Sequence, residues 1–148
     1  MTKLRKFQKL SRFERKLLLQ AFFLLPATAL AFRLFGLKHL RATLPPIPNS
    51  ETKQAETLAQ AQNAQCIARM VRIAATHGFR RASCLVQSLV LWRLLRRHGI
   101  ASELRIGTRK AENQFQAHAW VECGGVPLND SGDVRDSFTA FDLDTVST

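Results

Sequence analysis

The segment from Phe115 to Glu122 reads FQAHAWVE, so small or apolar side chains alternate with His118 and other larger ones. Successive side chains of a strand point to opposite faces, and this period of two therefore predicts a β-strand. Gly124 and Gly125 follow, and the run VPLND then resumes an extended pattern. Because glycine allows the positive φ that tight turns need, the whole segment predicts an antiparallel hairpin.

The length of the hairpin loop decides whether His118 can face Asp130. A two-residue loop, Gly124-Gly125, would pair His118 with Ser131 and would turn Asp130 to the other face of the sheet. A three-residue loop that also includes Cys123 would pair His118 with Asp130, with their Cβ atoms about 5 Å apart. Three-residue loops with glycine in the left-handed conformation are common in hairpins. We therefore predict the three-residue loop.

Cys84 stands upstream, directly before the amphipathic run LVQSLVLWRLLRRHG. The apolar residues recur at helical spacing, Ser83 is a suitable N-cap and Gly99 is a suitable terminator. These features predict a helix from about Cys84 to His98. The first turn of a helix offers free N–H groups and a partial positive charge, which stabilise a thiolate and can hold an oxyanion. Taken alone, the segment also fits a small buried cysteine at a helix start.

The order Cys84, His118, Asp130 supplies the three groups that cysteine peptidases and related acyl transferases use. We predict Cys84 as the nucleophile, His118 as the base and Asp130 as the acid that orients the imidazole. With a two-residue loop and no bulge, Asp133 or Asp136 would have to be considered in place of Asp130. Each residue alone has a structural explanation, and the combination of all three favours catalysis.

Three further side chains are candidates for the same site. Gln87 and Gln116 carry amides that could complete an oxyanion hole beside the backbone N–H of Cys84. Trp120 would flank His118 on one face of the strand, where it would form core or pocket wall. No CxxC motif or pair of histidines suggests zinc, so we expect neither a metal nor a cofactor.

Three segments in order resemble a known family: CLVQSLVLWRLLRRHGI, LRIGT and FQAHAWVECGGVPLND. They are similar to the transglutaminase-like protease domain of lasso-peptide biosynthesis B proteins, which is the C-terminal domain of microcin-processing maturation enzymes. The resemblance covers roughly residues 67–130. It implies an α+β, papain-like cysteine protease fold with an N-terminal helical layer, and it assigns nucleophile, base and acid to Cys84, His118 and Asp130.

The same resemblance implies a function and partners. Such enzymes remove the leader peptide from a ribosomally made precursor before a separate cyclase closes the macrolactam ring. Residues 1–66 lack the strand-rich winged-helix pattern of a leader-recognition domain, so we expect a stand-alone leader peptidase that acts with a separate recognition protein. The macrolactam cyclase is a further candidate partner. Another acyl transferase on the same scaffold and a non-enzymatic adaptor are the alternatives.

The net charge of +11 is unevenly distributed. Seven cations lie within the first 16 residues, namely Lys3, Arg5, Lys6, Lys9, Arg12, Arg15 and Lys16. Such an arm suits an acidic peptide, a partner protein, nucleic acid or anionic lipid. No nucleic-acid-binding motif is present, so we do not expect nucleic acid as a partner. Three cysteines form no even disulfide framework, which favours the reducing cytoplasm.

The domain organisation follows from composition. We expect a basic and apolar helical region over residues 1–44, a proline-rich linker over 45–50 and the peptidase core over 51–148. The apolar run Leu17–Phe32 is short for a membrane span, which takes about 20 residues. We interpret it as two short helices bent near Pro26 that pack on the core or on a partner, with a membrane surface as the less favoured contact.

The peptidase core is predicted to open with a helix from about Glu51 to Thr76, capped by Ser50. Strands are expected near Ser102–Ile106, Phe115–Glu122 and Val126–Asn129. The residues from Ser137 onward offer Phe138 and Phe141 as anchors and otherwise lack a clear pattern.

Overall fold

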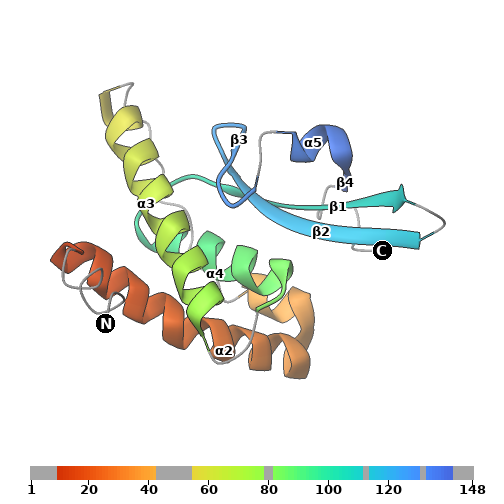
Figure 1. The fold of residues 1–148 in the computed structure, drawn as a ribbon, viewed down its shortest axis with the longest axis horizontal. Coiled ribbons are helices and arrows are strands. Elements are labelled where there is room, and N and C mark those ends of the chain that lie inside the picture. The colour runs from red at the N-terminus through yellow and green to blue at the C-terminus, as the bar shows by residue number, and fades with distance from the viewer. Residues whose placement is uncertain (1–9, 43–54, 79–81, 112–113, 131–132, 142–148) are drawn as a thin grey trace.

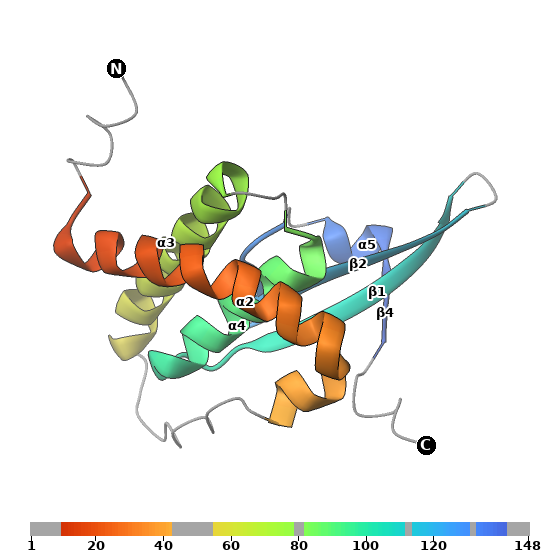
Figure 2. The same cartoon turned by 90° about the horizontal axis from the view of Figure 1, so that it is seen from below.

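The structure is a computed structural model that describes residues 10–42, 55–78, 82–111, 114–130 and 133–141. It has the predicted α+β architecture. Helix α2 forms the outermost layer, α4 lies between it and an antiparallel sheet, α3 packs against both α2 and α4, and the short helix α5 lies on the far side of the sheet (Figure 1). The view from below shows α2 crossing over α4, with the sheet behind them (Figure 2).

Helix α2 spans Arg12–Ala42 and does not break where the sequence suggested. It begins with a capping box, since the Ser11 hydroxyl accepts from the backbone N–H of Glu14 and the Glu14 carboxylate accepts from that of Ser11. The predicted position of the bend, near Pro26, is wrong, because the helix continues past Pro26 and the kink between two helical parts lies at Gly36, at φ 73°. Burial of the preceding residue, Leu25, in the core outweighs the one hydrogen bond that proline removes.

Helices α3 (Ala55–His77) and α4 (Cys84–Arg97) pack against α2 and against each other, and α4 also packs on the sheet. The predicted start of α4 is confirmed, with the Ser83 hydroxyl accepting from the backbone N–H of Val86 at 3.4 Å. Gly99 follows the helix at φ 70°, as its terminating role requires. Helix α3 ends at His77, close to the predicted end. The expected start near Glu51, its Ser50 cap and the proline-rich linker lie outside the described residues.

The hydrophobic core lies between the helices and one face of the sheet. The three long helices and the sheet each contribute buried side chains, namely Leu17, Ala21 and Leu25 from α2, Ile67, Met70 and Val71 from α3, Val90, Leu91, Leu94 and Leu95 from α4, and Leu104 and Val121 from the sheet. These residues fix α4 over the sheet, and α4 begins with Cys84. The core therefore holds the predicted nucleophile's helix in place.

The sheet has the strand order β3-β2-β1-β4. Strand β1 (Glu103–Ala111) is longer than predicted, and it pairs with β2 (Gln114–Cys123). Strand β3 (Val126–Pro127) is shorter than predicted. The two C-terminal elements were not predicted. Helix α5 (Val134–Ser137) is followed by strand β4 (Thr139–Phe141), which pairs with β1.

The hairpin between β2 and β3 corrects the predicted register. Cys123 pairs with Val126, so the loop contains only Gly124 and Gly125, and the three-residue loop is wrong. Both glycines have positive φ, 56° and 80°. Two consecutive glycines satisfy a type I′ turn, whose twist matches that of the flanking strands, and this favours the shorter loop.

Candidate active site

His118 and Asp130 meet in the structure in spite of the shorter loop. Nε2 of His118 contacts the carboxylate of Asp130, and both side chains are partly buried. The pairing of β3 stops at Pro127, so the alternation of the ladder does not extend to Asp130. The expectation that a two-residue loop would exclude Asp130 was therefore wrong. Asp133, one of the two substitutes, directly precedes α5.

Asn129 is the residue that redirects the chain. The backbone N–H of Leu128 still donates to the carbonyl of Val121 at 2.9 Å, as in a ladder. The N–H of Val121, however, donates to the side-chain oxygen of Asn129 at 2.8 Å. The Asn129 amide in turn donates to the hydroxyl of Ser88 at 2.9 Å, which ties this turn to α4. Sequence reasoning missed both Asn129 and Ser88, and a small polar residue inside an apolar helix was the available signal.

Ser88 also fixes α4 against the strand that carries His118. Its hydroxyl donates to the carbonyl of Ala119, the residue after His118, at 2.9 Å. One turn farther along α4, Trp92 Nε1 donates to the carbonyl of Ser102 at 3.0 Å, just before β1. Ser102 precedes Glu103, and Glu103 pairs with Glu122 of β2. The bond of Trp92 therefore lies farther along β2 than the bond of Ser88, and α4 runs over the sheet in the same chain direction as β2.

Cys84 is the first residue of α4 and is partly exposed. It lies one turn before Ser88, about 6 Å back along the helix, which corresponds to about two strand residues. This displacement leads from Ala119 toward the level of His118. Among the described residues, no hydrogen bond joins the Cys84 thiol to His118. Contacts of this kind are often long in enzymes without substrate.

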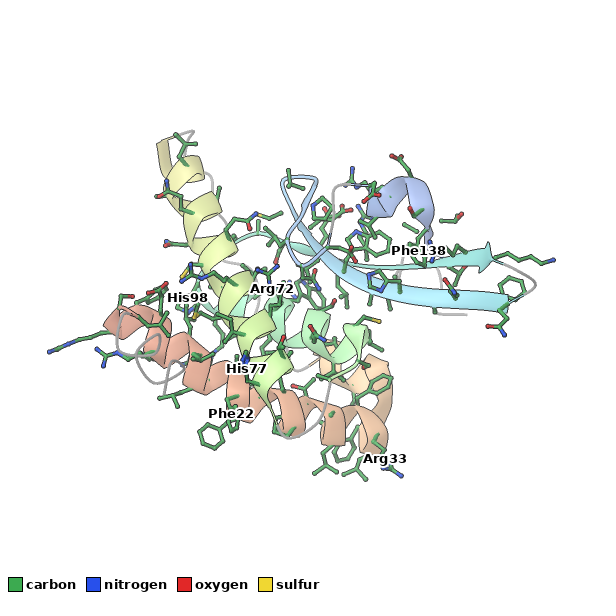
Figure 3. All side chains as sticks on the ribbon, in the orientation of Figure 1. Phe22, Arg33, Arg72, His77, His98 and Phe138 are labelled. Carbon is green, nitrogen blue, oxygen red and sulfur yellow. The ribbon has the colours of Figure 1, made fainter. Side chains whose placement is uncertain are left out.

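Two aromatic rings hold the imidazole from the side. The ring centroids of His118 and Trp120 lie 6.1 Å apart, and those of His118 and Phe138 lie 5.2 Å apart. Figure 3 labels Phe138 between α5 and the sheet. Trp120 is fully buried, which agrees with its predicted role as core or pocket wall. A Cβ at Gly107 would lie 3.0 Å from atoms of both Trp120 and Phe138, so glycine makes room for this packing.

Glu122 lies on β2 two residues beyond Trp120, on the same face of the sheet as His118 and Trp120. Its side chain is only 3% exposed and forms a two-point ion pair with Arg135 of α5. Trp120 Nε1 donates to it at 2.8 Å, and Arg105 lies 3.5 Å away. The hydrogen bonds from Arg135, supported by Trp120 and Arg105, lower the pKa of Glu122 to about 2. No local pattern predicts this ion pair, because Glu122 and Arg135 belong to different elements.

The two predicted amides occupy different positions. Gln87 lies in the first turn of α4 and donates from Nε2 to the carbonyl of Ala82 at 2.7 Å, beside Cys84. Gln116 is exposed on β2, and its side-chain oxygen accepts from Arg109 Nε at 2.7 Å. Gln87 thus shares the helix end of Cys84, whereas Gln116 belongs to a surface cross-strand pair.

Cys66, Cys84 and Cys123 are all free thiols. Burial raises the pKa of Cys66, helped by the charge of Glu14, and burial alone raises that of Cys123. Within the described ranges, no group of three or more His, Cys, Asp or Glu side chains could hold a metal ion.

Comparison with known proteins gives one family match and one relative. The sequence model of the transglutaminase-like superfamily matches residues 25–141, which include Cys84, His118 and Asp130. The microcin J25-processing protein McjB of Escherichia coli is 37% identical over 61 residues. That alignment covers 41% of this chain and 28% of McjB. No solved structure matches significantly.

Proposed function

Because this chain belongs to the transglutaminase-like superfamily, we propose that it is a cysteine peptidase that removes the leader peptide from a ribosomally made lasso-peptide precursor. The contact of His118 with Asp130 carries the proposal, because a base oriented by an acid is what a thiol nucleophile requires. Similarity to a microcin-processing protein supports the choice of substrate.

The contact supports one assignment of the two ring nitrogens of His118. A carboxylate accepts from Nε2–H, so the neutral ring carries its proton on Nε2 and leaves Nδ1 as the proton acceptor. Nδ1 takes the proton of the Cys84 thiol as the sulfur attacks the carbonyl carbon of the scissile bond. Asp130 stabilises the imidazolium that forms without itself taking the proton.

The remaining steps complete the hydrolysis. The tetrahedral intermediate collapses to a thioester as His118 gives its proton to the leaving amine. Water then attacks the thioester with His118 as base, and the carboxylic acid and the free thiol are released. The oxyanion lies against the N-terminal turn of α4, where the backbone N–H of Cys84 and the amide of Gln87 are the donors that we propose.

We also propose that the protein works in the cytoplasm with two partner proteins. A separate leader-recognition protein brings the precursor close and raises its effective concentration at the peptidase. The macrolactam cyclase then takes the product. Three free thiols suit the cytoplasm, where a thiolate nucleophile stays reduced.

The test is the mass spectrum of a precursor incubated with this protein and its recognition partner. We expect one cleaved bond with the wild type and with the control Cys66→Ala, and none with Cys84→Ala. Cleavage by Cys84→Ala at the wild-type rate would refute the proposal. A product joined to an amine instead of water would show an acyl transferase. Precursor that is bound and left intact by the wild type would show an adaptor.

A further inference from the structure

The outer side of α2 carries a stripe of exposed apolar side chains. Leu19, Phe23, Leu30 and Leu34 are 52%, 68%, 59% and 64% exposed. Their spacing of four, seven and four residues puts them on one face of the helix, opposite the side that Leu17 gives to the core. Helix α2 is the outermost layer of the fold (Figure 1), and Figure 3 shows Arg33 pointing away from α4 on this side.

Cations border this stripe at both ends, and acids do not. Arg15 and Lys16 precede it, Arg33 follows Leu30, and the sequence between Lys16 and Arg33 contains no charged residue. Near the first end, a groove of about 820 Å³ combines cations, among them Arg15, Lys16 and Arg97, with apolar Leu19 and Phe23.

The acid in the described part of α2 is Glu14, and it is already engaged. It caps the helix through Ser11 and pairs with Arg69 of α3 at 2.6 Å. The exposed surface of α2 therefore combines uncompensated positive charge with apolar area.

We propose that α2 docks the protein onto an anionic membrane surface, with the helix axis parallel to the bilayer. An amphipathic helix with cations beside its apolar face binds in this way, since apolar side chains enter the headgroup boundary and cations attract anionic lipid. The stripe from Leu19 to Leu34 extends about 22 Å along the surface.

A spanning arrangement conflicts with the fold. The described helix Arg12–Gly36 is long and apolar enough to cross a bilayer by length and composition alone. Its other face, however, packs Leu17, Ala21 and Leu25 into the core against α3 and α4. Spanning would strip these residues from their partners, whereas surface docking keeps every core contact.

The distribution of charge favours lipid over a second copy of the chain. In a symmetric dimer through the stripe, the same patch faces itself, so Arg15, Lys16 and Arg33 of one copy would meet cations of the other. No acid in the described stripe offsets that repulsion. An anionic lipid surface satisfies all of these cations at once.

The experiment is vesicle flotation of the full-length protein, with phosphatidylcholine vesicles and with vesicles of equal parts phosphatidylcholine and phosphatidylglycerol. We expect binding to the anionic vesicles, which falls as salt rises. The double variant Phe23→Ser/Leu30→Ser should bind at least about tenfold more weakly. Arg15→Gln/Lys16→Gln should bind about 30-fold more weakly. The matched control Phe115→Ser removes an 81% exposed ring from β2 and should bind like the wild type.

Three outcomes would overturn the inference: no binding to anionic vesicles, equal binding to both vesicle types, or equal loss with Phe115→Ser. A dimer in light scattering that Phe23→Ser/Leu30→Ser abolishes, without vesicle binding, would assign the stripe to a second copy. Circular dichroism verifies that each variant is folded, and the charge variant tests the proposal if the apolar variant unfolds. The result is independent of peptidase activity.

Discussion

The side chain of Asn129 takes the hydrogen bond of the Val121 N–H that a continued strand would satisfy with a backbone carbonyl. Because a side chain takes the place of the backbone carbonyl, the ladder of β2 and β3 ends after Pro127. Asp130, the residue after Asn129, can then reach His118. Asn129 also connects the turn to Ser88 and thus to the helix of Cys84. One asparagine therefore links all the elements that carry the candidate site.

Asn129→Ala should remove this link. We expect a loss of about 1–3 kcal/mol in the free energy of unfolding, because the buried N–H of Val121 loses its acceptor. Precursor cleavage should fall further than stability explains, since Asp130 loses its position. Urea unfolding and single-turnover cleavage at a temperature where the variant is folded measure the two effects. Asn63→Ala, on the exposed side of α3, is the control; an equal effect there would contradict the prediction.

Removing the groups of the proposed triad should produce graded losses. Cys84→Ala and His118→Ala should each lower kcat/KM for the precursor by about 10⁴-fold or more, because nucleophile and base act as a unit. Asp130→Ala should cost less, since an orienting acid contributes less than the groups it supports. Asp136→Ala, on α5, should retain activity. Full activity in His118→Ala would exclude the proposed base.

Gly107→Ala should disturb the aromatic packing around His118. The added Cβ would come within 3.0 Å of Trp120 and Phe138, and overpacking of this kind costs about 1–3 kcal/mol. Combining it with Phe138→Leu should recover part of the loss, because the smaller side chain can give way. Thermal unfolding of the two single variants and the double variant measures this coupling. Strict additivity would show that the two positions do not share space.

The sequence predicted what local patterns determine. Capping and periodicity were sufficient for the start of the Cys84 helix, and alternation was sufficient for the strand of His118. The loop was mispredicted because Gly124-Gly125 is compatible with both lengths, and the type I′ turn that two glycines allow favours the shorter one. Pro26 was overrated as a helix breaker because the packing of α2 on the core is not visible in a local pattern. The pairing of β4 with β1 and the ion pair of Glu122 with Arg135 join distant segments, so no local pattern reveals them.

The free energy of unfolding should depend on pH through the carboxylate of Glu122. Its folded pKa of about 2 lies below the ordinary 4.5, so the carboxylate stabilises the fold fully above about pH 4.5 and the effect disappears as the pH falls toward 2. The amount is on the order of 3 kcal/mol. Glu122→Gln should therefore unfold more easily at neutral pH and should lose this part of the acid dependence.

Urea titrations at neutral pH and at about pH 3 measure that difference. Glu103→Gln is the matched control, since Glu103 is 67% exposed and pairs only at the surface with Arg105. Its effect should stay below about 1 kcal/mol. An acid dependence in Glu122→Gln as steep as that of the wild type would contradict the assignment.

Iodoacetamide should distinguish the three thiols. Burial raises the pKa of Cys66 and Cys123, which lowers their thiolate fraction at neutral pH. Cys84 is partly exposed at the start of α4, and because the other two thiols are held protonated it should be alkylated at least about tenfold faster than either. Peptide mapping over time measures the three rates. Uniform rates would argue for an unactivated Cys84 and for the adaptor function.

Strand β3 pairs with β2 through only two residues, Val126 and Pro127. The segment that brings Asp130 to His118 thus has a two-residue ladder and otherwise depends on the hydrogen bonds of Leu128 and Asn129, while the core beneath it is extensive. Such a segment can open locally at a lower free energy than the whole domain needs to unfold. Heating should therefore inactivate the protein before it melts, and amide hydrogens of the 126–130 segment should exchange ahead of those in α4.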